Sequence, residues 1–169
     1  MLVQFSFGNY KCFKDENCLS ILAPGGKAYS NYSIKTPFRY SVVKTVPIYG
    51  ANASGKSKVL EAFKFMKCVI CPPMRKGKIP VFDYWQTKYD PFRLDTDSKN
   101  KDSFFECIFI LNNIQYRYGF EINAERITSE WLYQKKQREV LILSRKGEDE
   151  LYANPNDINV KISENVISA

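Results

Sequence analysis

Alternating apolar and polar residues open the chain. Val3, Phe5 and Phe7 alternate with polar side chains, and this period of two predicts a β-strand over residues 3–7. Residues 8–11 contain glycine and asparagine and predict a turn. Residues 18–22 are apolar at intervals, so we expect the chain to return there as a second strand.

A run of β-branched and apolar residues over 40–49 predicts the next strand. It follows residues 23–33, whose prolines, glycines and polar residues are typical of a loop. Pro47 cannot donate a backbone hydrogen bond, so we expect it at a sheet edge or at the entry to the strand.

Helical spacing appears over residues 57–70. The apolar positions there are Val59, Phe63, Met66 and Ile70, which would share one face of a helix. Two prolines at 72 and 73 end the helix, because proline cannot continue the hydrogen-bond ladder.

The second half of the chain is rich in short strand patterns. Residues 74–103 are polar with scattered aromatic residues and predict a long, partly ordered connection. Beyond it we expect an antiparallel meander with strands at 104–111, 114–122, 127–134, 140–145 and 151–152. Asn112 and Asn113 would form a two-residue turn, since asparagine tolerates positive φ, and residues 147–149 would form another turn.

The composition is that of a globular protein, with 44% hydrophobic and 25% charged residues in a chain of 169. We expect one unit over 1–169, divided into strands, loop and helix (1–73), the connection (74–103) and the meander (104–169). No apolar stretch approaches the length of a membrane span, and the first residues lack the pattern of a signal peptide. We therefore expect a cytoplasmic protein with no membrane partner.

Charge and histidine content narrow the chemistry. Residues 1–80 hold 13 lysines and arginines against three carboxylates, so this half is suited to an anionic ligand. The chain has no histidine, which excludes a Ser-His-Asp triad, a Cys-His dyad and an HExxH zinc site built from this chain alone. Its five cysteines are an odd number and favour reduced thiols over a disulfide framework.

Residues 50–57, here called the phosphate loop, match the pattern G-x-x-x-x-G-K-[ST] between an apolar segment and the predicted helix. Such a loop directs successive backbone N–H groups toward phosphate oxygens, aided by the positive end of the following helix. The residues expected to hold ATP phosphates are Gly50, Asn52, Ala53, Ser54, Gly55, Lys56 and Ser57. Lys56 would reach the β- and γ-phosphates, and the Ser57 hydroxyl would ligate Mg²⁺.

Two common classes with this loop fit poorly. A GTPase would carry Asn-Lys-x-Asp, whereas Asp102 stands one place too early after Asn100 and Lys101. A small-molecule kinase has its loop near the start, followed by alternating helices and parallel strands, whereas here two strands precede the loop and a meander follows.

Five stretches carry a resemblance to a known family. They are FGNYKCFKDE at 7–16, IYGANASGKSKVLEA at 48–62, PFRLD at 91–95, YRYGFE at 116–121 and EWLY at 130–133. Together they resemble the N-terminal part of prokaryotic AAA-family ATPases with ABC-type heads similar to those of RecF, SMC and the OLD nucleases.

The resemblance implies an α/β fold, the N-terminal lobe of an ABC-type P-loop head with a large antiparallel meander, incomplete without a C-terminal half. It implies that Asn9, Tyr10 and Lys11 lie near the nucleotide, with Lys11 where many relatives place arginine. It also implies ATP hydrolysis, closure of two heads on ATP, and work on DNA or in phage defence.

The chain departs from the family in the groups needed for hydrolysis. No apolar strand ends in Asp-Glu, since Leu111 runs into Asn112 and Leu143 into Ser144, and the signature motif and the switch histidine are missing. The chain therefore resembles a first lobe that self-associates or joins a C-terminal ATPase half. Two alternatives stay open: a non-hydrolysing nucleotide-sensing or interaction module, and a DNA-binding protein whose loop is incidental.

Two weaker signals have structural alternatives. Cys68 and Cys71 form a C-x-x-C that is half of a zinc site or a pair of thiols at a helix end. A basic run from Lys58 to Lys78, with Tyr84 and Trp85 beyond it, is either a DNA-contacting surface or a solvated face.

Overall fold

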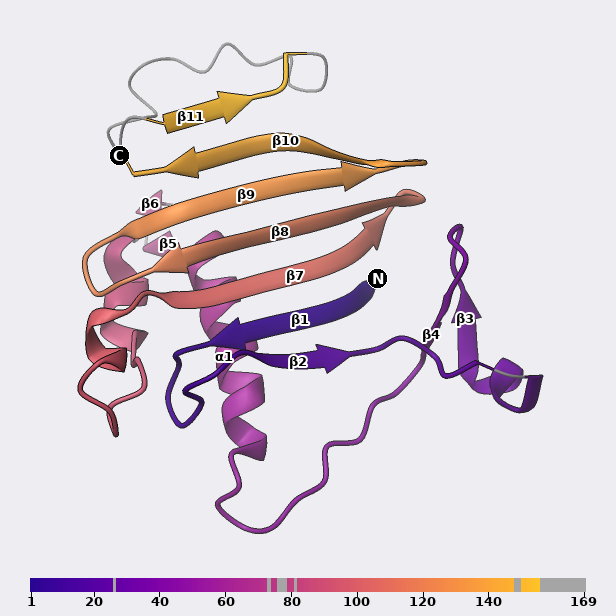
Figure 1. The fold of residues 1–169 in the computed structure, drawn as a ribbon, viewed down its shortest axis with the longest axis horizontal. Helices are drawn as coiled ribbons and strands as arrows, with labels where there is room; N and C mark the ends of the chain where they lie inside the picture. Colours follow the sequence, from indigo (N-terminus) through magenta and orange to yellow (C-terminus); the bar gives the residue numbers. More distant parts are fainter. Residues whose placement is uncertain (26, 73, 76–78, 81, 148–149, 156–169) are drawn as a thin grey trace.

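The computed structural model describes residues 1–25, 27–72, 74–75, 79–80, 82–147 and 150–155. Its main feature is an antiparallel sheet with the strand order β11-β10-β9-β8-β7-β1-β2, with one α-helix, α1, behind it (Figure 1). The strands are β1 (Leu2–Gly8), β2 (Asn17–Ser20), β7 (Ser103–Leu111), β8 (Ile114–Ile122), β9 (Ile127–Lys135), β10 (Glu139–Lys146) and β11 (Glu150–Ala153). The fold is thus α/β with a predominantly antiparallel sheet, as expected.

The predicted meander is confirmed as strands β7 to β11. Asn112 and Asn113 have φ values of 50° and 63°, the left-handed conformation that a tight hairpin turn requires. Leu111 and Ile114 pair on either side of them and set the register of β7 against β8. The meander therefore follows from local turn chemistry and alternation.

Strand β1 occupies an internal position in the sheet. It pairs with β2 on one side and, across about a hundred residues of sequence, with β7 on the other. Phe5 and Phe7 project from it into the core, and both are less than 2% exposed. The first strand thus joins the beginning of the chain to the meander.

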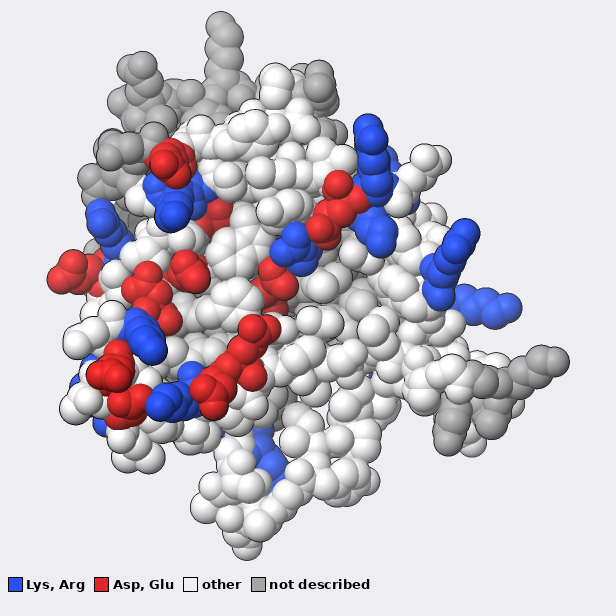
Figure 2. Space-filling view, viewed as in Figure 1, with Lys and Arg blue, Asp and Glu red and all other residues white. Residues whose placement is uncertain are grey.

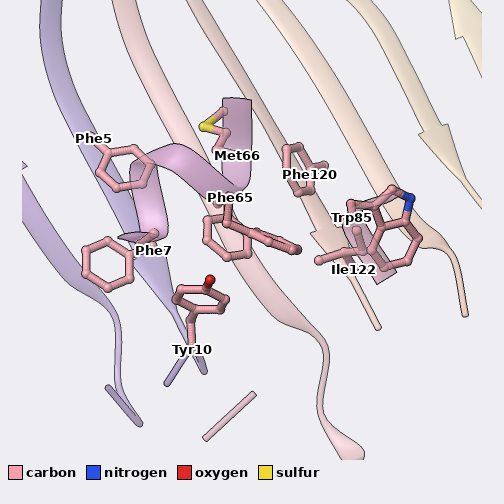
Figure 3. Close-up of a cluster of buried hydrophobic side chains, with 10 residues drawn as sticks. Phe5, Phe7, Tyr10, Phe65, Met66, Trp85, Phe120 and Ile122 are labelled. Atoms are coloured by element: carbon pink, nitrogen blue, oxygen red, sulfur yellow. The ribbon is translucent and has the colours of Figure 1, made fainter. Parts of the chain in front are cut away.

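Helix α1 (Lys56–Ile70) covers one face of the sheet. The main core cluster lies between them, with Phe65 of α1 among its rings (Figure 3). Its buried members are Phe5, Phe7, Tyr10, Ala62, Phe65, Met66, Trp85, Phe105, Phe120 and Ile122.

The buried face of α1 differs from the predicted stripe. Ala62, Phe65 and Met66 are buried, whereas Phe63 and Ile70 are 41% and 47% exposed. The helix is apolar on two neighbouring faces, so spacing alone did not decide which of them meets the sheet. The second face, which also contains Leu60 at 57% exposure, is turned more toward solvent, although Phe63 still packs edge-on against Phe5.

The predicted strand over 40–49 is wrong for most of its length. The strand β4 covers Ser41–Val43 and pairs with β3 (Ser33–Lys35), whereas residues 44–50 belong to no strand. Ile48 is 38% and Tyr49 is 87% exposed. A strand needs a hydrogen-bonding neighbour, and Pro47 also removes one donor, so apolar composition was insufficient.

The β3–β4 hairpin, preceded by a 3₁₀ turn, η1 (Lys27–Tyr32), stands at one end of the sheet. Residues 27–32 were expected as part of a loop, and Ser41–Val43 lie within the predicted strand. It packs through a second cluster in which Val3, Val42 and Ile110 are buried.

The connection over 74–103 contains more structure than predicted. It holds β5 (Met74–Arg75), β6 (Ile79–Pro80) and the 3₁₀ turns η2 (Phe82–Lys88) and η3 (Ser98–Asn100). Trp85 is 8% exposed and belongs to the core, so it is not available to stack on a base. Of the basic run, Lys76 and Lys78 lie outside the described residues.

Candidate phosphate-binding site

The phosphate loop connects the exposed segment 44–50 to the first turn of α1. Gly55 stands at the cap position of the helix with φ 91° and ψ 2°, a left-handed conformation that favours glycine. A Cβ at this position would lie 3.1 Å from Cys12 Sγ and 3.2 Å from Phe13 Cζ. The last glycine of the loop is therefore fixed both by its backbone angle and by close neighbours from the turn after β1.

The loop also closes on itself at its other end. A Cβ at Gly50 would lie 2.7 Å from Ser54 Oγ, and the Ser54 N–H donates to the Ala51 carbonyl at 3.3 Å. Ala53 takes φ 63°, so the chain curls between the two glycines. This curl turns consecutive peptide groups toward one side, as a phosphate-binding nest requires.

The first turn of α1 has unused hydrogen-bond donors. No side chain caps the helix, and within the described residues the N–H groups of Gly55, Lys56 and Ser57 have no acceptor. The Lys58 and Val59 N–H groups, by contrast, both donate to the Gly55 carbonyl. The three unused donors lie at the positive end of the helix and form a local site for an anion.

Lys56 folds back into the loop. Its ammonium donates to the Gly50 carbonyl at 2.8 Å and to the Ala51 carbonyl at 2.6 Å. The charge is therefore held in the loop by neutral acceptors that a phosphate can replace with stronger, charged ones.

Ser57 is the second residue of α1, and it is exposed. Its hydroxyl is one hard oxygen ligand, and no group of three or more histidine, cysteine or acidic residues gathers anywhere in the described chain. Mg²⁺ commonly takes one or two protein ligands together with phosphate oxygens and water, so this single hydroxyl fits Mg²⁺ only as part of a complex with phosphates. The same result gives no support for a zinc site at Cys68 and Cys71.

The turn after β1 places Lys11 beside α1 and beside the connection over 74–103. Lys11 Nζ lies 3.2 Å from Glu61 on α1 and 3.2 Å from Asp90 in the connection, and its backbone N–H donates to the Asp90 carbonyl. Glu61 also accepts a hydrogen bond from Lys58 at 2.7 Å, and this contact, together with Lys11, lowers the pKa of the Glu61 carboxyl. Three segments that are distant in sequence are thus tied together beside the start of α1.

Asn9 and Tyr10 are buried beneath this turn. The Asn9 amide donates to the carbonyls of Ser98 and Lys101 at 2.9 and 2.7 Å, and its Oδ1 accepts from the Phe92 N–H. Tyr10 is 2% exposed and packs against Phe65, and burial raises the pKa of its phenol well above the usual range. Both side chains therefore hold the turn in place.

Cys12 and Phe13 were not singled out from the sequence, although they contact the phosphate loop. They directly follow the Asn-Tyr-Lys segment, and the Phe13 ring meets Phe7 edge-on at 4.9 Å between centroids. Beyond Lys11 lies an open hollow of about 470 Å³, lined by Lys11, Thr87, Lys88, Tyr89, Asp90 and Arg93. It offers room for a ligand extending past the loop.

Two comparisons with known proteins bear on this site. A family model described as "AAA domain, putative AbiEii toxin, Type IV TA system" matches residues 47–156, from just before the phosphate loop to the end of the meander. No curated protein matches the chain. Among the described residues, no helix is long and apolar enough to span a membrane.

Proposed function

Since the chain belongs to the AAA-domain family whose model covers residues 47–156, we propose that its phosphate loop binds ATP together with Mg²⁺. One observation carries the proposal. The N–H groups of Gly55, Lys56 and Ser57 lie without acceptors at an uncapped helix start, and the Lys56 ammonium lies in the same loop. Converging donors and positive charge at a helix N-terminus favour the phosphates of a nucleotide.

In this proposal the backbone of Gly50, Asn52, Ala53, Ser54 and Gly55 surrounds the phosphates. Lys56 exchanges the Gly50 and Ala51 carbonyls for the β- and γ-phosphate oxygens, a change from neutral to charged acceptors. The Ser57 hydroxyl orients Mg²⁺, which neutralises phosphate charge when bound.

Lys11 extends the site toward the open hollow, while Asn9 and Tyr10 hold the turn that carries it. Glu61 and Asp90 share the Lys11 ammonium at 3.2 Å each, which keeps its position fixed relative to α1. A lysine there supplies charge without the bidentate geometry of arginine. We propose that Lys11 lies near the bound nucleotide.

Calorimetric titration of Mg²⁺-ATPγS tests the proposal. Wild-type protein should bind, Lys56→Ala should lose binding, and Lys64→Ala should bind as wild type. Lys64 is a suitable control because it is an exposed lysine on the same helix. Equal binding by wild type and Lys56→Ala would contradict the assignment of the site.

Hydrolysis in this proposal requires a second lobe. Strands β7 and β10, where an Asp-Glu pair was sought, both belong to the antiparallel meander. Asn112 follows the end of β7, and Ser144 follows the apolar residues within β10. The outward face of α1 and the exposed Ile48 and Tyr49 form apolar surface next to the phosphate loop. We propose that a C-terminal ATPase half or a second copy covers this surface and supplies the missing carboxylates.

A non-hydrolysing nucleotide-sensing module is the second candidate, favoured because no apolar strand pattern in the given sequence ends in Asp-Glu. Phosphate-release assays separate the two functions. ATP binding with no phosphate release above that of Lys56→Ala supports the module, and release that Lys56→Ala abolishes supports the ATPase. Light scattering over a range of concentrations tests self-association, which a monomer at high concentration would contradict.

The work of the complete protein is proposed from the family. Its description names an AbiEii toxin of a type IV TA system, and the resemblance noted from the sequence includes ATPases that act on DNA. We propose that the complete protein uses ATP to act on DNA or in phage defence.

A further inference from the structure

Six basic side chains gather at one end of the sheet, and we call this surface the basic end. Lys35, Arg39 and Lys44 come from the β3–β4 hairpin and the residue after it, and Lys135, Lys136 and Arg138 come from the end of β9 and the β9–β10 turn. Figure 2 shows lysine and arginine side chains on this right-hand side, while most acidic side chains lie toward the left and centre and some lie beside the upper basic ones.

The two parts of the basic end are joined by side-chain contacts. The Tyr40 hydroxyl donates to Gln115 Oε1 at 2.6 Å, and Gln115 is the cross-strand partner of Lys135. Lys135 Nζ lies 5.9 Å from the centroid of the Phe38 ring, which stacks on Tyr40. The hairpin is therefore fixed against β8 and β9, and its charges are on the same surface as those of the turn.

None of these cations is in an ion pair among the described residues, where each ion pair involves other basic side chains. The sequence contains no aspartate or glutamate between Glu16 and Glu61, which explains why the hairpin lacks carboxylates. Glu139 stands beside the turn as the cross-strand partner of Lys135, and Arg117 and Lys135 both lower the pKa of its carboxyl. Arg117 donates to both Glu139 oxygens, at 3.2 and 2.8 Å, so the positive charge of the basic end is only partly compensated.

Some other basic residues on the surface lie close to carboxylates. The open hollow of about 640 Å³ that includes Arg93, Lys99 and Lys101 also includes Asp102 and Glu125 in its lining. Lys11 and Arg93 both contact Asp90. At the basic end, by contrast, cations from two separate elements meet, and Arg117 already holds the neighbouring Glu139.

We propose that the basic end binds the phosphodiester backbone of nucleic acid. Lysines and arginines spread over two elements suit a row of separate phosphates, and such contacts bind without reading the base sequence. The inference deepens the DNA-directed role proposed above, but it rests on a surface separate from the phosphate loop.

Fluorescence anisotropy with a labelled DNA duplex, measured over a salt series, tests this inference. The test variant combines Arg39→Ala, Lys136→Ala and Arg138→Ala, all at exposed positions. Loss of three phosphate contacts should reduce the slope of log K against log salt by about 2.7, which corresponds to roughly five-hundredfold weaker binding near 0.1 M salt.

The control variant combines Lys64→Ala, Lys67→Ala and Lys99→Ala, which removes the same charge from other exposed positions. It should bind DNA within a small factor of wild type. Equal weakening of both variants, or wild-type binding with no salt dependence, would overturn the inference. Displacement of the duplex by polyglutamate as readily as by unlabelled DNA would instead assign the surface to an acidic protein.

Lys56→Ala separates this inference from the proposed ATP site. It should leave the DNA affinity measured without nucleotide unchanged, and the triple variant of the basic end should retain ATPγS binding. DNA binding without ATP binding by wild type would disprove the ATP proposal and support a nucleic-acid-binding protein with an incidental loop. ATP binding without DNA binding would disprove the inference alone.

Discussion

Replacing Gly55 by alanine tests the construction of the phosphate loop. Gly55 has φ 91° and Gly147 has φ 63°, so alanine at either position must adopt a left-handed conformation. This conformation costs alanine about 1–2 kcal/mol, partly offset by about 0.4–1 kcal/mol from the smaller entropy of the unfolded chain. Gly147→Ala, where a Cβ would meet nothing within 4 Å, should therefore lower the free energy of unfolding by about 1 kcal/mol.

Gly55→Ala adds a packing conflict to the same backbone effect. Its Cβ would lie 3.1 Å from Cys12 Sγ and 3.2 Å from Phe13 Cζ. Cys12 is exposed and can turn aside, but the Phe13 ring is held edge-on against Phe7. Overpacking of this kind costs about 1–3 kcal/mol, so Gly55→Ala should be destabilised by about 2–4 kcal/mol in total.

Urea denaturation of the two variants and wild type measures these differences, and calorimetry with Mg²⁺-ATPγS measures their effect on binding. Gly55→Ala should also lose nucleotide affinity, because the shift needed to relieve the contact moves the free N–H groups of the first helical turn. Gly147→Ala should bind as wild type. The same small loss of stability in both variants, together with full nucleotide affinity of Gly55→Ala, would refute the packing conflict at Gly55.

Three further predictions concern the surroundings of the loop. Asn9→Ala leaves one buried carbonyl, one partly buried carbonyl and one N–H without their partner and should lower the free energy of unfolding by about 2–4 kcal/mol in urea denaturation; a loss below about 1 kcal/mol would contradict this structural role. Mg²⁺-ATP should slow alkylation of Cys12, which contacts Gly55, and leave the exposed Cys18 on β2 unchanged; mass spectrometry showing equal protection of both thiols would count against a ligand at the loop. The hydrogen bond from Lys14 lowers the pKa of Asp95 to about 2, so its stabilisation is full above the unfolded value near 3.8 and is lost as the pH falls through about 2. The acid denaturation profile of Lys14→Met should therefore be shallower between these pH values, and a profile identical to wild type would show that the pair does not affect stability.

Local patterns predicted the meander and the helix. Asn112 and Asn113 require a tight turn whatever surrounds them, and the alternation on either side sets the strands. The strand over 40–49 was predicted from equally apolar residues, but it has no neighbour to pair with beyond Val43. Apolar composition shows that a segment can pair, whereas the partner depends on distant parts of the chain.

The candidate site also has one part that the sequence predicted and another that it did not. The phosphate loop was recognisable because its function depends on consecutive residues, from Gly50 to Ser57. The contacts of Lys11 with Glu61 and Asp90, and the approach of Cys12 to Gly55, depend on the pairing of β1 with β7 and were not accessible from local spacing. The basic end was missed for a related reason, since its two halves are about a hundred residues apart in sequence.

The internal position of β1 has a consequence for the order of folding. β1 leaves the ribosome before the other described strands, yet its partner β7 begins at Ser103, so β1 cannot pair on that side until about a hundred further residues have been synthesised. Long-range pairing of this kind slows folding because the loop-closure entropy is lost before the contacts form. During that interval Phe5 and Phe7 have no complete core to enter, and α1 has no sheet to cover. The phosphate loop can therefore take its final shape only after the meander has been synthesised, and the proposed nucleotide binding waits for the same strands.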